Sequence, residues 1–130
     1  MSKFLVDIID KYDWSHFVTI TNKNDIGLSS FKKKYKQFFK YLNKTDIYYQ
    51  KYLTTLITFE MNGNNQLHVH SFIKDVDKNK TKDLETLLKR YFGQSKVYIY
   101  DKTKNAKYYV ANKYNKLIDF DLIKINSRRR

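Results

Sequence analysis

The chain is 130 residues long, which suits one domain with a buried core, and its lack of cysteine excludes a disulfide framework and a Cys-based zinc site. Its 26 Lys and Arg residues outnumber 13 Asp and Glu residues, and the formal charge of +13 indicates a polyanionic partner; nucleic acid is favoured over a membrane surface because the expected helices lack a Trp-rich apolar face. No apolar run approaches membrane-spanning length and no signal-peptide pattern is present, so we expect a cytoplasmic protein, intracellular and not secreted.

Four segments have the composition of β-strands. The first, "HFVTIT" (16–21), is rich in β-branched residues. Two more, "YLTTLITFE" (52–60) and "QLHVHSFIK" (66–74), flank the turn sequence "MNGNN" and predict a hairpin. The fourth strand is "KVYIY" (96–100).

Three segments carry apolar residues at helical spacing. The first spans residues 28–42 and has a basic opposite face. The second follows Asp77 to Thr81 and stops at Gly93, and the third runs from about Thr103 to Lys116. The segment "LIDFDLIKINSRRR" (117–130) alternates too imperfectly for an assignment, and it closes in a basic tail over residues 126–130.

The order of these elements is strand, helix, strand, strand, helix, strand, helix. It predicts an α+β fold of the ferredoxin-like split βαββαβ(α) type, with a central antiparallel sheet and helices on one of its faces. We expect residues 1–130 to form a single domain of this kind, with an active site on the open face of the sheet.

Two of the three histidines lie one residue apart in the second strand of the hairpin. Because side chains alternate along a strand, His68, His70 and Phe72 share one face, while the aliphatic residues between them face the helices. A hairpin centred on Asn64 pairs Glu60 with His68, and directly opposed residues have Cβ atoms roughly 5 Å apart on the same face. Two imidazoles and one carboxylate then converge, which suits a divalent cation.

Other interpretations of these residues remain open. A His-x-His pair by itself is more often incidental than metal-binding, and a register slip of one residue would turn Glu60 to the other face. We expect His16, for which no partner can be identified, to be structural or on the surface.

The chain resembles the His-hydrophobic-His endonucleases, specifically the single-tyrosine replication initiators of rolling-circle plasmids and small viruses. Three motifs carry the resemblance over essentially the whole chain and occur in the family's order: "FVTIT" (17–21), the metal motif "LHVHSF" (67–72) and the tyrosine motif "YYVANKYNK" (108–116). Glu60, eight residues before His68, matches the position from which related initiators often supply an acidic ligand.

The resemblance implies an enzyme that cleaves and joins single-stranded DNA at a replication origin or origin hairpin. In such a reaction a tyrosine hydroxyl attacks a phosphodiester and stays bound to the 5′ phosphate, and the freed 3′-OH primes replication before the reaction reverses. Mg²⁺ or Mn²⁺ held by His68, His70 and Glu60 would assist the attack. The expected DNA contacts come from four residues, namely Thr19, Thr21, Lys107 and Lys116.

Two tyrosines compete for the role of nucleophile. If Ala106, Val110, Tyr114 and Leu117 form the buried stripe of the last helix, Tyr109 falls beside that stripe and Tyr108 points away from it. We therefore expect Tyr109 to be the nucleophile, with Lys113 one turn later to hold the phosphate or stabilise the phenolate; Tyr108 is the alternative. Many family members carry this lysine three residues after the tyrosine, whereas here it follows by four.

Two other functions fit the same pattern. A single-tyrosine insertion-sequence transposase shares the fold and the metal motif, although a glutamine commonly stands there in place of Lys113. A non-catalytic single-stranded DNA-binding protein would keep the sheet and the charge but form no covalent adduct. A two-histidine phosphoesterase is excluded because a second His-x-Thr or His-x-Ser motif is missing.

The expected partners follow from the implied reaction. The sequence has no Gly-rich phosphate loop of the Walker type, so we expect a host helicase and a host polymerase to unwind and copy the DNA. We also hypothesise a homodimer, because one tyrosine per chain can cut only once before it must reverse. A Tyr-rich helix that only packs on the sheet is the simplest competing interpretation of the tyrosine motif.

Overall fold

The computed structural model describes residues 2–21, 26–45, 52–61, 67–103 and 117–126. In chain order its elements are α1 (Ser2–Lys11), β1 (Trp14–Thr21), α2 (Leu28–Leu42), β2 (Tyr52–Met61), β3 (Leu67–Lys74), a short 3-10 helix η1 (Lys78–Lys80), α3 (Thr81–Phe92), β4 (Ser95–Ile99) and β5 (Leu117–Asn126). The four strands and the first two helices expected from the sequence are confirmed. The expected helix from Thr103 to Lys116 lies almost wholly outside the described residues.

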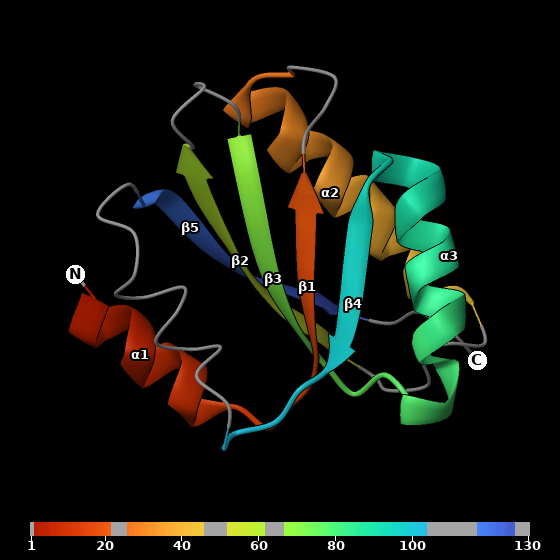
Figure 1. Ribbon diagram of the computed structural model, residues 1–130, viewed down its shortest axis with the longest axis horizontal. Helices are drawn as coiled ribbons and strands as arrows, with labels where there is room; N and C mark the ends of the chain where they lie inside the picture. The colour runs from red at the N-terminus through yellow and green to blue at the C-terminus, as the bar shows by residue number, and fades with distance from the viewer. Residues whose placement is uncertain (1, 22–25, 46–51, 62–66, 104–116, 127–130) are drawn as a thin grey trace.

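One five-stranded sheet holds the described strands in the order β4-β1-β3-β2-β5, and each neighbouring pair is antiparallel (Figure 1). The segment from β1 to β4 has the strand order 4-1-3-2 of the ferredoxin-like split arrangement. The predicted α+β fold with a central antiparallel sheet is confirmed. β5 adds a fifth strand beside β2, in the segment where the sequence pattern gave no assignment.

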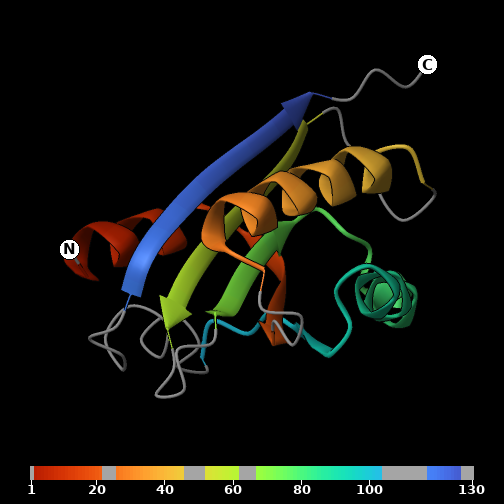
Figure 2. The same ribbon diagram turned by 90° about the horizontal axis from the view of Figure 1, so that it is seen from above.

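The main core lies between the sheet and the helices α2 and α3, which cover the same face (Figure 2). The apolar stripe predicted for α2 is buried, and so are three residues of α3. α3 ends at Gly93, whose φ of 82° lies in the left-handed region that favours glycine. Each large side chain fully buried in this core stabilises the fold by about 1.5–3 kcal/mol.

The opposite face of the sheet is not entirely open, because α1 packs against one end of it. Leu5 and Ile9 of α1 form a second apolar cluster with Trp14, Leu56 and Phe72. The indole nitrogen of Trp14 donates a hydrogen bond of 2.8 Å to the carbonyl of Ile9, which ties the end of the helix to β1. The expectation of an open face is therefore corrected: α1 covers one end, and Figure 2 shows it across the sheet from α2 and α3.

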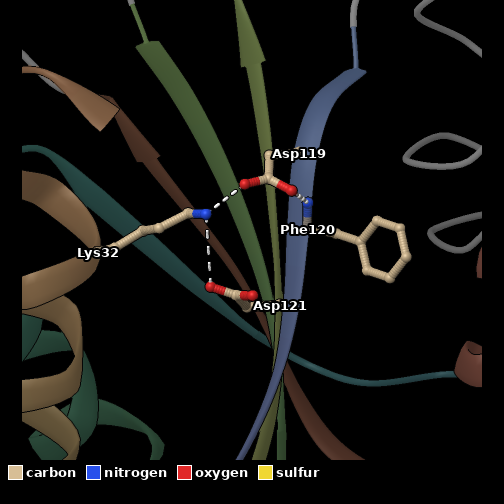
Figure 3. A network of polar contacts seen from close by, with 4 residues as sticks. All are labelled: Lys32, Asp119, Phe120 and Asp121. Carbon is tan, nitrogen blue, oxygen red and sulfur yellow. Dashed lines mark hydrogen bonds and ion pairs between the residues drawn. The ribbon is translucent and has the colours of Figure 1, made fainter. Parts of the chain in front are cut away.

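β5 is fixed to α2 by a polar contact on the helical face of the sheet. Lys32 lies between two carboxylates of β5, with its ammonium against Asp119 and 3.7 Å from Oδ2 of Asp121 (Figure 3). The hydrogen bond from Lys32 to Asp119 raises the pKa of Lys32 and lowers the pKa of Asp119. These acids occupy positions that apolar residues would fill in an ordinary half-buried strand, which is why β5 escaped prediction.

Candidate functional site

The hairpin of β2 and β3 has the register predicted from the sequence. Glu60 pairs with His68 and Thr58 pairs with His70, so no slip has moved the carboxylate to the other face. Their neighbours Phe59 and Val69 face the helical core instead and are fully buried. The alternation of the strands therefore brings both histidines and Glu60 to the face opposite α2 and α3.

His70 is the centre of the contacts at this site. Its Nε2 lies 2.8 Å from Oε1 of Glu60, and its Nδ1 lies 3.3 Å from Oγ1 of Thr19. The ring of Phe17 stacks on it at a centroid distance of 5.5 Å and an angle of 13°. The His68 ring meets it edge-on, with centroids 4.9 Å apart. His70 is thus held on three sides by residues of β1, β2 and β3.

The site is buried although it lies on the face away from the main core. Glu60 and His70 are 3% and 1% exposed, and His68 is partly buried. Burial lowers the pKa of His68, the neighbouring His70 lowers it further, and Glu60 acts in the opposite direction. The His68 ring is therefore neutral near pH 7, which is the form that binds a metal.

The side chains of Glu60, His68 and His70 are of the kinds that bind divalent cations. Glu60 Oε2 is buried and has no hydrogen-bond partner among the described residues, and a buried carboxylate oxygen in this state is costly unless something compensates it. Two imidazole nitrogens and a carboxylate suit Mn²⁺ or a similar ion. Within the part of the chain that the structure describes, however, no three His, Cys, Asp or Glu side chains are arranged to hold a metal. Instead, Oε1 of Glu60 contacts Nε2 of His70 directly, at 2.8 Å.

The remaining predicted site residues fall into two groups. Thr19 and Thr21 pair with His70 and His68 across β1 and β3, so they lie on the site face. The other five candidates from the tyrosine motif and its surroundings lie outside the described residues, namely Lys107, Tyr108, Tyr109, Lys113 and Lys116.

The sequence predicted that His16 is either structural or on the surface, and it is structural. It is fully buried on the helical side of β1, with its ring nitrogens 2.9 Å from Ser15 Oγ and 2.8 Å from Thr81 Oγ1. It therefore joins β1 to the start of α3. Burial and the charge of Lys78 lower its pKa from 6.5 to about 4, against the opposing effect of Asp77.

A pocket of about 220 Å³ opens beside Thr19, whose hydroxyl contacts His70, at the end of β1 and the start of β4. Its lining joins the two predicted threonines to three residues that the sequence did not single out, and consists of Thr19, Thr21, Gln94, Ser95 and Lys96. Nothing in the sequence distinguishes Lys96 among 26 basic residues, because its place depends on the pairing of β4 with β1.

Comparison of the chain with protein-family models, curated proteins and solved structures found no match. In the described part of the chain, no helix is both long and apolar enough to cross a membrane.

Proposed function

We propose that this protein is a metal-dependent endonuclease that nicks single-stranded DNA at a replication origin and rejoins it, as initiators of rolling-circle replication do. The observation that supports the proposal most directly is the grouping of Glu60, His68 and His70 on one face of the sheet, where one carboxylate oxygen of Glu60 has no hydrogen-bond partner in the described part of the chain. The charge of +13 suits the polyanionic substrate. Such a protein would act in the cytoplasm of a host cell.

The roles of the residues follow from this proposal. Mg²⁺ or Mn²⁺ held by Glu60, His68 and His70 would supply positive charge for the phosphate oxygens in the transition state. Tyr109 supplies the nucleophile: its hydroxyl gives up its proton to solvent and its oxygen forms a bond to phosphorus, while the bond from phosphorus to the 3′ oxygen breaks and that oxygen takes up a proton from solvent and leaves as a hydroxyl. Lys113 holds the scissile phosphate.

Formation of a covalent adduct tests the proposal. The protein and its Tyr109→Phe and Tyr108→Phe variants are incubated with labelled origin-derived single strands in Mn²⁺ or in EDTA, and the products are separated on denaturing gels. We expect an adduct that requires Mn²⁺ and disappears only in Tyr109→Phe. Loss only in Tyr108→Phe would reassign the nucleophile, and absence of an adduct in every arm would contradict the proposal.

The control for the metal ligands is His68→Ala, which should abolish the adduct without removing a residue of the main core. Strands from paired transposon ends serve as a second substrate. Cleavage of these ends in preference to origin hairpins would indicate an insertion-sequence transposase instead of an initiator.

One observation favours a non-catalytic single-stranded DNA-binding protein as the second candidate. Glu60 already contacts His70 directly, and the described acidic and histidine side chains have no metal-binding arrangement. Such a protein would bind the same strands with a steep dependence on salt, yet it would give no adduct with Mn²⁺.

A further inference from the structure

β4 presents two side chains to the same face of the sheet as the histidines. Lys96 pairs with Thr19 and Tyr98 pairs with Phe17, and directly opposed residues on neighbouring strands point to the same side. Thr19 in turn pairs with His70, so Lys96 stands two strands away from this histidine, at roughly 10 Å. Lys96 is exposed, and Tyr98 is 51% exposed.

The pocket beside Lys96 has the lining of an anion site. The residues that line it in the described part of the chain, Thr19, Thr21, Gln94, Ser95 and Lys96, carry hydroxyl, amide and ammonium groups, and none of these five is acidic. The Ser95 hydroxyl donates to the carbonyl of Gly93 at 3.3 Å. The pocket thus offers donors and one positive charge next to the hydroxyl that contacts His70.

The backbone around this pocket is fixed on both sides. The amide of Thr21 donates to the carbonyl of Gln94 at 3.0 Å, which closes the end of the β1–β4 pair. On the outer edge of β4, the amide of Val97 donates to Oε2 of Glu85 at 3.1 Å. Glu85 of α3 therefore takes up one backbone donor on the edge of β4, while Lys96 and Tyr98 on the face of this strand are exposed.

We propose that Lys96 and Tyr98 form a second contact strip for single-stranded DNA, outside the cation site. Lys96, with Thr19 and Thr21, binds a phosphodiester that neighbours the cleaved one, and the ring of Tyr98 stacks on a base. A cation beside an exposed aromatic ring on one face is the combination that binds single strands without reading their sequence. The choice of DNA as the ligand rests on the proposed function, whereas the pocket, the charge and the exposed ring are features of this structure.

Binding without cleavage tests this strip. Affinity for a short fluorescein-labelled oligo(dT) is measured by anisotropy in EDTA over a series of salt concentrations. We expect Lys96→Ala to weaken binding and to reduce the slope of log K against log salt by about 0.7, the share of one phosphate contact on a single strand. We expect Tyr98→Ala to weaken binding by about 5- to 150-fold at constant slope, while Tyr98→Phe binds like the wild type.

Matched controls come from the other side of the sheet. Lys82→Ala and Tyr41→Ala remove exposed residues of the same kinds from α3 and α2 and should change affinity little. Effects of Lys96→Ala and Tyr98→Ala no larger than those of these controls would overturn the inference. The inference would also be overturned if inorganic phosphate binds the pocket as a competitor while Lys96→Ala leaves the affinity for DNA unchanged.

The outcome is independent of the proposed catalysis, since EDTA prevents cleavage. Oligo(dT) binding that depends on Lys96, together with no adduct on origin strands, would support the strip and contradict the nuclease. The reverse pattern would support the nuclease and overturn the strip. Both variants change exposed side chains, and circular dichroism confirms that each is folded.

Discussion

Acidification should weaken this fold through His16. The folded state lowers the pKa of this buried imidazole from 6.5 to about 4, so the unfolded chain takes up a proton in a range where the folded chain does not. Stability is therefore complete above the unfolded value and falls as the pH drops toward the folded value. With 1.36 kcal/mol for each pH unit, the loss amounts to about 2 kcal/mol between about pH 7.5 and about pH 5.

Burial gives the pKa shift of His16 its sign, because it is the largest influence and favours the neutral ring. The charge of Lys78 acts in the same direction, and that of Asp77 in the opposite one. The ring nitrogens lie 2.9 Å and 2.8 Å from the hydroxyls of Ser15 and Thr81, which themselves donate to the carbonyls of Ile73 and Lys78.

Urea unfolding of the wild type and of His16→Gln, measured at a series of pH values, checks this reasoning. Other groups titrate in both proteins, so the difference between the two curves isolates His16. We expect the free energy of unfolding of the wild type, relative to that of His16→Gln, to fall by about 2 kcal/mol as the pH drops to about 5. Two curves that run parallel over this range would refute the assignment of the pH dependence to His16.

Three further predictions concern other contacts. Tyr35→Phe removes a fully buried hydroxyl of α2 that forms a hydrogen bond with Ser71 of β3, and it should lower the free energy of unfolding in urea by about 1–2 kcal/mol. An unchanged free energy would mean that Ser71 finds another partner. Mn²⁺ should raise the melting temperature of the wild type but not that of Glu60→Gln. At about a hundredfold excess over Kd, Mn²⁺ adds up to about 2.7 kcal/mol to the stability of the wild type, and equal shifts in the two proteins would contradict a cation at Glu60. Lys32→Met should cost no more than about 1 kcal/mol, less at high salt, because the contact with Asp119 is partly exposed; a larger, salt-independent loss would show that packing dominates there.

The hairpin could be predicted because its signals are local. "MNGNN" marks the turn, and alternation then fixes both the register and the face, so the pairing of Glu60 with His68 follows from sequence alone. Side-chain rotamers do not follow from alternation, and the direct contact between Glu60 and His70 was accordingly not foreseen.

The residues that the sequence did not reveal depend on distant parts of the chain. α1 was not recognised although Leu5 and Ile9 lie one helical turn apart, and its target includes Leu56 and Phe72, which are far along the chain. Lys96 gains its place beside the histidines only because β4 pairs with β1. Strand order is a property of the whole sheet, and no local pattern within β4 encodes it.

Glu60 and His70 are buried ionisable residues in strands whose other buried polar residues are threonine and serine. A buried carboxylate oxygen that has no hydrogen-bond partner among the described residues is a cost to folding, and natural sequences concentrate such costs at functional sites. The cost is tolerable here because the intervening positions, Phe59 and Val69, pair with each other on the opposite face and are fully buried in the main core. The same two strands therefore supply the rigidity that holds the polar groups in place. If the proposed function holds, substitutions of Glu60 or His70 should alter cation binding and DNA cleavage while the register of the hairpin persists.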